Sequence, residues 1–414
     1  MERRVAVTGL GAVSPVGNDA VTTWESLKAG KSGIGLITKF DTTDYKVKVA
    51  AEVKDFDPSD LLSVPERRRN DLFTQYALVA ADEAMRDSGL DVEDSIDRNR
   101  LGVYIGSGIG GIGTTIQNTE KLLNGGPRKV SPFLIPSMIV NMAAGQVSIR
   151  NKAYGPTLPV VTACTTSSNT IGEAFRAIKH GYADAIIAGG SEAAVVTLAV
   201  AGFSNMKALT KNPDPATACR PFDADRDGFV IGEGAAVLIL EDLEHAQKRG
   251  AHIYAEIAGY GNTADAYHIT TPDPEASGIT RAIKEAVEEA GLNPAEGLYI
   301  NAHGTSTKFN DKSETLGFKQ ALGEDAARAA KISSTKSMTG HMLGAAGAIE
   351  ALACVKALEE HTVPPTINYQ TPDPECDLDY TPNEVVTFDA KWALSTNLGF
   401  GGHNGCLAFK AYEE

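Results

Sequence analysis

Apolar positions along the chain follow two alternating patterns. Residues 101–105, 183–188 and 235–240 are short runs that are apolar almost throughout and end at glycine or polar residues, which is typical of buried strands. Elsewhere, as in 279–290 and 345–358, apolar residues recur at three- and four-residue spacing, which predicts helices with one buried face. The alternation of the two patterns predicts an α/β protein with helices packed on a buried sheet.

The same order of elements occurs twice along the chain. A strand, a turn of small residues and a helix are predicted around Cys164, and an alanine-rich helix again follows such a turn around His341. We therefore expect two similar halves, residues 1–253 and 254–414, whose two helix starts face each other across a shared centre. The expected strands are 5–10, 101–105, 183–188, 235–240, 253–259, 298–302, 332–335, 393–398 and 406–410, and the main expected helices are 24–29, 69–88, 171–178, 243–249, 279–290, 311–322 and 345–358.

The first of the two turns places a cysteine at a helix start. Val160 and Val161 predict a strand that ends near Thr162, directly before Cys164. A thiol at a helix N-terminus meets the positive end of the helix dipole, which favours the nucleophilic thiolate, and free backbone N–H groups there could hold an oxyanion. The pattern alone leaves a second interpretation open, a small buried apolar residue, because free cysteine is among the most buried residue types.

Three of the eight histidines lie in glycine-rich turns at predicted element ends, namely His303, His341 and His403. A single histidine at a strand end is usually structural. Several histidines flanked by small residues, which allow a ligand close to the backbone, favour a functional site.

A glycine-rich turn follows the predicted strand at 101–105. Gly106, Gly108 and Gly111 have the spacing of a dinucleotide-binding turn, but no acidic strand end follows about twenty residues later. We therefore interpret this turn as a flexible wall beside a pocket.

Composition and charge exclude several classes of function. The chain has 414 residues and a net charge of -15, which argues against general affinity for nucleic acid or anionic membranes, although Arg67–Arg69 could form a local basic patch. Its five cysteines are scattered without a CxxC pair, which is typical of a reducing compartment and not of a disulfide framework or a zinc site. No secretion signal and no membrane-spanning run is recognisable, so we expect a cytoplasmic protein.

Two long sequence strings carry a specific resemblance. They are NAHGTST at 301–307 and KSMTGHMLGAAG at 336–347. Together with the Cys164 turn they closely resemble the β-ketoacyl-acyl carrier protein synthases, condensing enzymes of the thiolase superfamily, over nearly the whole chain. A Cys-His-His set is similar to that of the elongating type II members, β-ketoacyl-acyl carrier protein synthase II.

The resemblance implies an architecture and a set of partners. We expect a thiolase-like fold of two βαβαβ-type halves packed as a layered α/β/α/β/α sandwich, and a homodimer. The implied partner is acyl carrier protein, whose phosphopantetheine arm delivers acyl and malonyl groups. No cofactor, metal ion, nucleic acid or membrane partner is expected.

The resemblance also implies roles in a decarboxylative condensation. Cys164 would accept the acyl chain, and His303 and His341, both neutral, would donate N–H bonds to the malonyl thioester oxygen where negative charge develops. Lys336 would support the two histidines electrostatically. Phe400 would act as a gate between the acyl and malonyl steps, and its backbone N–H, with that of Cys164, would form the oxyanion hole.

Further residues are assigned by the same resemblance. Glu314 would anchor the histidine network, Ile109 and Phe203 would line the acyl pocket and its mouth, and three residues would contact substrate: Thr305, Thr307 and Gly401. A carrier-protein patch would consist of Arg68, Arg69 and Lys207. An ordinary solvated face is the alternative for these three, because exposed basic residues are common.

Three alternative functions remain open at this stage. A thiolase would need a second catalytic cysteine, for which Cys406 is the candidate. A chain-length partner subunit would look alike but lacks the nucleophile, which Cys164 argues against. A polyketide ketosynthase would carry the same three catalytic residues.

Two departures from the family pattern are visible. The chain reads Ser-Thr-Asn at 395–397, where family members commonly have Ser-Asn-Ser, which weakens the implication of any structural cation site built from those side chains. It also reads Lys308-Phe309 where many members begin with proline, so that loop is expected to have a different shape.

Overall fold

A single nine-stranded sheet forms the centre of the computed structural model, which describes residues 2–92 and 94–413. The strand order is β4-β5-β6-β1-β7-β13-β12-β8-β9. The strands of this sheet are β1 (Val5–Val13), β4 (Leu101–Gly106), β5 (Ala185–Glu192), β6 (Gly234–Asp242), β7 (Ala255–Ala264), β8 (Leu298–Asn301), β9 (Lys331–Ser333), β12 (Trp392–Gly399) and β13 (His403–Ala411).

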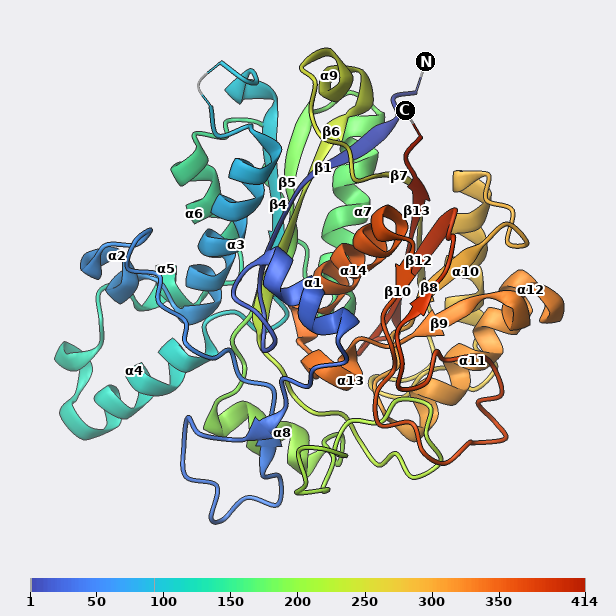
Figure 1. Ribbon diagram of the computed structural model, residues 1–414. Helices are drawn as coiled ribbons and strands as arrows, with labels where there is room; N and C mark the ends of the chain where they lie inside the picture. Colours follow the sequence, from blue (N-terminus) through green and yellow to red (C-terminus); the bar gives the residue numbers. More distant parts are fainter. Residues whose placement is uncertain (1, 93, 414) are drawn as a thin grey trace.

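Helices lie on both sides of the sheet and in its middle (Figure 1). The helices are α1 (Ala20–Lys28), α2 (Val64–Arg69), α3 (Leu72–Ser88), α4 (Ile112–Gly125), α5 (Leu134–Met138), α6 (Met142–Asn151), α7 (Thr166–Lys179), α8 (Thr197–Asn205), α9 (Leu243–Lys248), α10 (Ser277–Ala290), α11 (Lys308–Leu322), α12 (Glu324–Ala329), α13 (Lys336–Thr339) and α14 (Ala346–Glu360). Two short hairpins pair β2 (Gly35–Leu36) with β3 (Val49–Ala50) and β10 (Thr362–Val363) with β11 (Val386–Thr387). Short 3-10 turns at Ala163–Thr165 and Leu343–Ala345 precede α7 and α14.

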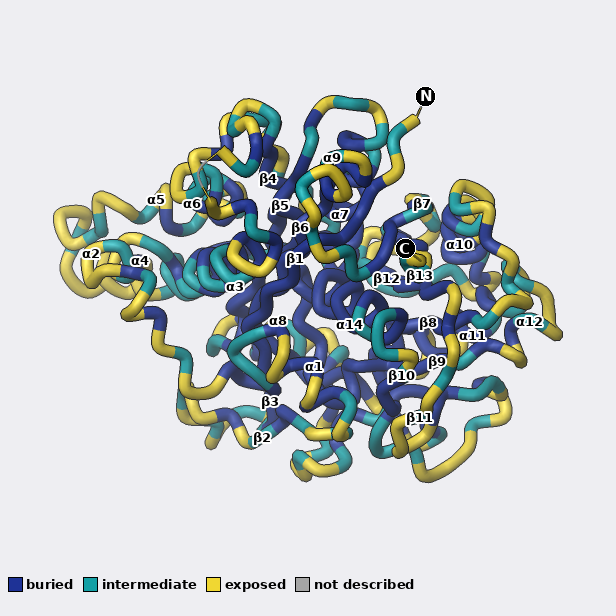
Figure 2. The backbone as a smooth tube through the Cα atoms, turned by 45° about the horizontal axis from the view of Figure 1, so that its top comes forward, coloured by how far each residue is buried: buried dark blue, intermediate teal, exposed yellow. Residues whose placement is uncertain are grey.

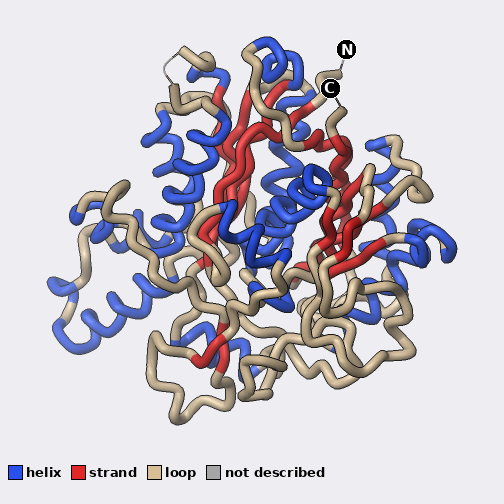
Figure 3. The backbone as a smooth tube through the Cα atoms, in the orientation of Figure 1, coloured by secondary structure: helices blue, strands red, loops and turns tan. Residues whose placement is uncertain are grey.

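The elements stack in five layers. Helices α7 and α14 pack against each other between the two wings of the sheet, α7 on β4, β5 and β6 and α14 on β8, β12 and β13 (Figure 3). Helix α3 covers the outer face of the first wing, and α10 with α11 covers the outer face of the second. The expected α/β/α/β/α sandwich is therefore confirmed.

The central helices are buried because their first turns consist of small residues, which in α14 are also mostly apolar. In α14 the first ten residues are all buried, and in α7 the first seven are buried although most of them are polar. A helix that is apolar all round belongs in a core. Figure 2 shows this continuous buried region running through the strands and both central helices.

The two wings of the sheet repeat the same strand arrangement outward from a joint between β1 and β7. At the joint, β1 and β7 pair over only three positions, Val5 to Val7 with Ile257 to Ala255. Outward from it, the first wing continues with an antiparallel β6 and the second with an antiparallel β13. The next pairings, β6 with β5 and β13 with β12, are again antiparallel, and β4 and β8 then add parallel to β5 and β12. This repetition accounts for two similar halves; the exact boundary between 253 and 254 stays a prediction.

The predicted strand before Cys164 is wrong. Residues 160–162 form no strand, and the pairing of this segment with β4 is limited to a bridge between Thr157 and Val103, with hydrogen bonds of Pro156 and Leu158 to Val103. Pro156 and Pro159 lack backbone N–H groups, so they cannot donate to a ladder, and the pairing ends there.

The helix predicted at 69–88 is α3, which begins three residues later, at Leu72, after a separate short helix, α2. Asn70 has extended backbone angles that end α2, and Asp71 accepts a hydrogen bond from the N–H of Phe73 as the N-cap of α3. Arg68 and Arg69 consequently lie in the last turn of α2 and not on the long helix.

Candidate active site

Cys164 lies in a strained turn at the start of α7. Ala163, directly before it, has a φ of +52°, a region that residues other than glycine rarely occupy. The start of α14 repeats this geometry, since Leu343 has a φ of +48° and a 3-10 turn again leads into the helix. Each half thus leads into its central helix through the same backbone turn, with Cys164 inside the first turn and His341 two residues before the second.

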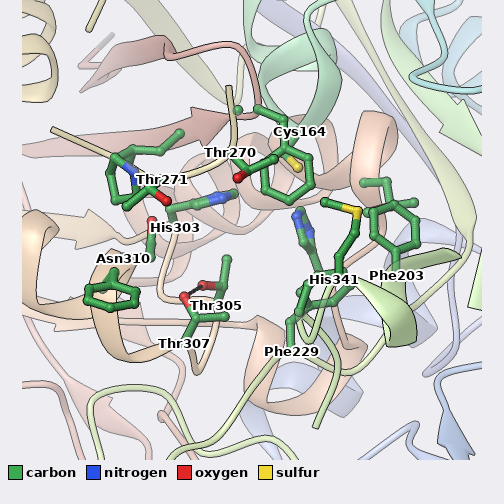
Figure 4. A pocket seen from close by; sticks show the side chains of 18 of the residues that line it. Cys164, Phe203, Phe229, Thr270, Thr271, His303, Thr305, Thr307, Asn310 and His341 are labelled. Carbon is green, nitrogen blue, oxygen red and sulfur yellow. Dashed lines mark hydrogen bonds between the residues drawn. The ribbon is translucent and has the colours of Figure 1, made fainter. Parts of the chain in front are cut away.

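Three distant segments bring Cys164, His303 and His341 together. One ligand atom from each side chain lies within 4.8 Å of the others, and the two imidazole rings are 5.1 Å apart at an angle of 87°. Figure 4 shows the sulfur and both rings directed into one space. The sequence prediction that these residues share a site is confirmed as geometry, and their catalytic roles stay predictions.

The three side chains line a cavity of about 360 Å³. Its walls combine apolar and aromatic side chains with the hydroxyl groups of four threonines, a mixture typical of a small-molecule site. The lining residues are Cys164, Phe203, Met206, Lys207, Ala208, Phe229, Asp265, Thr270, Thr271, Pro272, His303, Thr305, Thr307, Phe309, Asn310, His341, Leu343, Leu398, Gly399, Phe400 and Gly402.

Burial dominates the protonation state of Cys164. It raises the pKa of the thiol to about 12, although the positive charge of Lys336 and the backbone N–H groups of Phe400 and Cys164 act in the opposite direction. The expectation that the helix dipole favours a resting thiolate is therefore wrong for this structure. The N–H groups that act on the sulfur are the pair expected to form the oxyanion hole.

Both histidines are neutral. Burial holds the pKa of His303 well below its usual range, and the charge of Lys336 and the proximity of His341 lower it further. Burial and Lys336 have the same effect on the pKa of His341. A neutral imidazole carries one N–H donor and one bare nitrogen, so each ring can offer a single hydrogen bond to a substrate oxygen.

A buried carboxylate fixes the backbone of His303. Glu314, on α11, accepts hydrogen bonds from the N–H groups of His303 at 2.6 Å and Gly304 at 2.8 Å, and from the hydroxyl of Thr396 at 2.6 Å. Burial raises the pKa of Glu314 to about 7, and these donors oppose the rise. Glu314 therefore holds the turn of His303, in agreement with the anchoring position expected for it.

His341 is fixed differently. Its N–H donates to the carbonyl of Val230 at 2.7 Å, and its ring meets the ring of Phe229 edge to face at 5.2 Å. Nδ1 of His341 is buried and has no hydrogen-bond partner among residues 2–92 and 94–413.

Lys336 lies behind the cavity and does not line it. Its ammonium group is buried and forms an ion pair with Glu350 of α14. The second oxygen of Glu350 accepts a hydrogen bond from the side-chain amide of Asn397 at 2.8 Å. The positive charge of Lys336 thus acts on Cys164 and both histidines from a fixed position.

Phe400 lies at the cavity wall in a turn held by a second loop. The Gly401 N–H donates to the carbonyl of Ile269 and the Asp265 N–H donates to that of Gly402, each at 2.8 Å. The rings of Phe400 and Phe203 are 6.5 Å apart. Gly401 itself is exposed and outside the cavity lining, so its part in substrate binding stays a prediction.

Three of the other predicted substrate contacts line the cavity, and the fourth lies outside its lining. Phe203, Thr305 and Thr307 line the cavity, and the two threonine hydroxyls are 2.8 Å apart. Ile109 is outside the lining but packs in the same apolar cluster as Cys164 and Phe203.

The predicted carrier-protein patch does not line one depression. Lys207 is exposed at the rim of the Cys164 cavity. Arg68 lines a separate depression beside α2, and the exposed Arg69 lies over the ring of Phe133 at 4.9 Å. The role of these basic residues stays a prediction.

Sequence reasoning missed three polar residues that hold the site. Glu192 and Asn397 are fully buried near the ends of β5 and β12, and Glu350 is fully buried in an apolar part of α14. A buried carboxylate or amide costs free energy unless it is hydrogen-bonded, and polar residues in predicted buried elements were the available signal.

The structure argues against the thiolase alternative. Cys406, its candidate second cysteine, is fully buried in a different apolar cluster and does not line the cavity. This geometry does not test the other two alternatives, a chain-length partner subunit and a polyketide ketosynthase.

The sulfur and the two imidazoles also form a donor set that zinc can accept. Binding of such an ion would occupy the thiol and both rings at once. The expectation that the site works without a metal or a cofactor stays a prediction.

The helices among the described residues are all too short or too polar to cross a membrane.

Comparison with known proteins gives matches over nearly the whole chain. Residues 2–246 match the family described as "Beta-ketoacyl synthase, N-terminal domain", and residues 254–370 match "Beta-ketoacyl synthase, C-terminal domain". The chain is 53% identical over 411 residues to 3-oxoacyl-[acyl-carrier-protein] synthase 2 of Staphylococcus aureus, covering 99% of each. It is 51% identical over 407 residues to the protein of the same name from Coxiella burnetii, covering 98% of each.

Solved structures with the same fold include two of related activity. A ketosynthase of a type II polyketide synthase, in complex with its acyl-carrier protein and bound to the hexaketide, superimposes with a TM-score of 0.90 at 37% identity, covering 100% of both chains. A beta-ketoacyl synthase from Burkholderia phymatum gives a TM-score of 0.92 at 35% identity, covering 99% of this chain and 100% of that one.

Proposed function

The chain belongs to the beta-ketoacyl synthase family, and we propose that it is an elongating 3-oxoacyl-[acyl-carrier-protein] synthase of a dissociated fatty-acid system. The observation that supports this proposal most is the convergence of one thiol and two neutral imidazoles in a single cavity. That set suits an acyl transfer followed by a decarboxylative carbon-carbon bond formation.

In the first step, Cys164 takes the acyl chain from its carrier. The sulfur attacks the thioester carbonyl, the carrier thiolate leaves, and the thiol proton passes to that thiolate, so an acyl-cysteine and a free carrier thiol result. The backbone N–H groups of Cys164 and Phe400 would hold the negative oxygen of the tetrahedral intermediate. Because the pKa of the buried thiol is about 12, the thiolate must form during the attack, with these donors and Lys336 stabilising it.

In the second step, malonyl carrier enters and loses carbon dioxide. The electron pair of the broken carbon-carbon bond moves into the thioester as an enolate, whose oxygen would accept N–H bonds from His303 and His341. The enolate carbon then attacks the acyl-cysteine, the Cys164 thiolate leaves and regains a proton, and 3-oxoacyl carrier is released. Neutral rings suit this step because a charged imidazolium would give its proton to the enolate.

Access to the cavity supports a gating role for Phe400. Its turn is fixed by hydrogen bonds to the loop at 265–269, so a movement of one requires a movement of the other. Thr305 and Thr307, toward the outer part of the cavity, offer hydroxyl groups to the amides of a phosphopantetheine arm.

We further propose acyl carrier protein as the partner, a homodimer as the assembly and the cytoplasm as the compartment. Lys207 at the cavity rim offers positive charge to an acidic carrier. A second copy could cover exposed apolar side chains such as Ile135, Tyr154 and Leu158. Five cysteines, none in a disulfide among the described residues, suit a reducing compartment.

Polyketide chain extension is the second candidate, favoured by the 37% identity to a polyketide ketosynthase. The test is incubation of the purified enzyme with acyl carriers of graded length and malonyl carrier, followed by mass spectrometry of the carrier-bound products. One round of condensation to a 3-oxoacyl carrier supports the proposal, and repeated extension without reduction supports the polyketide alternative. Absence of both products would exclude the proposed reaction.

A further inference from the structure

Asn397 occupies the point where the two halves of the site meet. Its side chain is fully buried on β12, between the first turn of α7 and the turn of His303. Oδ1 accepts a hydrogen bond from the hydroxyl of Ser168, while Nδ2 donates to Glu350 at 2.8 Å and lies 3.1 Å from Nδ1 of His303. One amide therefore contacts the helix of Cys164, the partner of Lys336 and one imidazole.

The orientation of this amide follows from its partners. Glu350 is ion-paired with Lys336, and a carboxylate accepts but does not donate hydrogen bonds. The group of Asn397 that faces Glu350 must therefore be the NH2 group, which leaves Oδ1 for the hydroxyl of Ser168. An NH2 group has two hydrogens, so the second is available for His303.

This orientation assigns the protons of the His303 ring. An N–H from Asn397 directed at Nδ1 favours a bare Nδ1 and a single proton on Nε2, whereas the carbonyl of Leu398, which also acts on this ring, can only accept a hydrogen bond. The ring reaches into the space between Cys164 and His341 (Figure 4), where a donor is needed. His341 differs, since its Nδ1 has no partner among the described residues.

We propose that Asn397 is a positioning residue that holds His303 in the Nε2–H tautomer, so that this ring always presents a donor to the malonyl thioester oxygen. The role of that donor rests on the proposed function, whereas the tautomer itself does not. A neutral histidine without such a partner distributes its proton between two nitrogens, and any fraction on Nδ1 removes the donor from the site.

Nitrogen NMR of the wild-type enzyme labelled with ¹⁵N-histidine tests the tautomer directly. We expect a neutral His303 ring whose Nε2 carries the proton and whose Nδ1 is bare, assigned by comparison with His303→Ala. A ring with its proton on Nδ1 would overturn the proposal. This measurement requires no activity and no folded Asn397 variant.

Malonyl decarboxylation tests the consequence. It is measured as carbon dioxide release from malonyl carrier in a Cys164→Gln background, which removes any dependence on acylation. Asn397→Leu, which keeps the volume but has no donor, should lower kcat about 10- to 100-fold with little change in KM, the loss typical of removing a partner that orients a functional histidine. Acylation of Cys164 by acyl carrier, followed by mass spectrometry with Asn397→Leu as the only change, should stay within about threefold of wild type.

Asn397→Asp gives a signature that a packing defect would not. The new Asp lies against the carboxylate of Glu350, so the two share a proton at low pH. Once that proton is lost, the Asp carboxylate can only accept and draws the proton of neutral His303 to Nδ1, so that Nε2 keeps a proton only in the imidazolium form. Decarboxylation by this variant should increase as the pH falls from about 9 to about 6, whereas the enzyme with Asn397 should be nearly constant there because both rings are neutral. Equal pH profiles would contradict the proposal.

A matched control separates stability from positioning. Asn118 is also a buried asparagine but lies on α4, away from the cavity, where its side chain caps local backbone groups. Asn118→Ala should leave the decarboxylation rate and its pH profile unchanged. If the enzyme with Asn397 shows no decarboxylation at all, the proposed function fails; if it does and Asn397→Leu is equally fast, only the inference about Asn397 fails.

Discussion

The turns that carry Cys164 and His341 have nearly the same backbone but different environments. Both contain one left-handed residue, Ala163 or Leu343, and both continue through a 3-10 turn into a central helix. The helix after Cys164 opens with three hydroxyl residues, whereas the helix after His341 opens with alanine and glycine. The fold therefore contains the same turn before each central helix. The side chains in and beside each turn decide which chemistry takes place there.

The small residues of the second turn allow the two copies to touch. A Cβ at Gly347 would lie 2.1 Å from the hydroxyl of Ser168. Glu192 joins the second turn to the glycine-rich turn after β4, because it accepts hydrogen bonds from the N–H groups of both Gly344 and Gly108. The asymmetry of composition thus has a steric cause: one turn provides hydroxyls and the other makes room for them.

The largest expected effect separates the roles of the two turns. Cys164→Gln should abolish acyl-enzyme formation and lower condensation by at least about 10,000-fold, because the group that forms the covalent bond is gone. Malonyl decarboxylation, which depends on the histidines, should remain. The measurements are mass spectrometry of the protein after incubation with acyl carrier and carbon dioxide release from malonyl carrier; acyl labelling that persists would refute Cys164 as the nucleophile.

The reciprocal change is made in the second half. His303→Ala and His341→Ala should each lower condensation about 100- to 1,000-fold, the usual cost of one lost donor to a developing oxyanion. Acyl transfer to Cys164 should stay measurable, since the donors proposed for that step are the N–H groups of Cys164 and Phe400. Single-turnover acylation and steady-state condensation are measured on the same preparations, and unchanged condensation in either variant would exclude that histidine from the mechanism.

The contact between the two helix starts is tested by adding one methyl group. Gly347→Ala should lower the free energy of unfolding by about 1–3 kcal/mol, because Ser168 crowds the new Cβ with both its hydroxyl and its backbone nitrogen, at 2.1 and 2.7 Å. Urea-induced unfolding at a fixed protein concentration measures this.

Gly202→Ala is the matched control for that change. Gly202 lies in helix α8 with no atom within 4 Å of the added Cβ among the described neighbours, so the variant should be more stable by about 0.4–1 kcal/mol. If both variants change stability equally, close contact at Gly347 is not the cause.

The sequence predicted the strands and helices that have a regular apolar pattern, but it did not predict the irregular segments between them. Apolar runs located the nine strands of the sheet to within a few residues, and the helix at 345–358 is α14. The break at Asn70 and the unpaired segment before Cys164 were missed, although Asp71 as a cap and Pro159 as a residue without an N–H were visible. In both cases a single residue with special backbone chemistry overrode an apolar pattern.

The candidate site was predicted in its identity but not in its electrostatics. Resemblance of motifs selected Cys164, His303 and His341, and the fold brings them together. The pKa of Cys164 could not be predicted, because it depends on burial by segments far away in the sequence, which outweighs the local helix dipole. The contacts of Asn397 were hidden for the same reason, since its three partners come from three different elements.

The smallest expected effect compares the two buried carboxylates, Glu192 beside the Cys164 turn and Glu314 beneath His303. Burial raises the pKa of each to about 7, above the value of about 4.3 in an unfolded chain. Between these values the folded protein binds more protons than the unfolded one, so the stabilisation present at low pH is lost as the pH rises through 7. The free energy of unfolding should therefore be lower at about pH 8 than at about pH 5.5 by at least about 1 kcal/mol.

Replacing each carboxylate separately tells whether the two sides contribute alike. Glu192→Gln and Glu314→Gln cannot titrate, so each should flatten the dependence of the unfolding free energy on pH in urea titrations between about pH 5.5 and about pH 8. Glu83 on α3, whose pKa burial also raises to about 7, lies outside the cavity, and Glu83→Gln should flatten the same curve without changing condensation.

Condensation should instead fall in Glu314→Gln, because the amide would turn an N–H toward the N–H groups of His303 and Gly304 and displace the ring. If the wild-type protein and both the Glu192→Gln and Glu314→Gln variants show the same dependence on pH, Glu192 and Glu314 do not take up protons on folding, because the neutral His303 and His341 contribute the opposite slope equally in all three proteins.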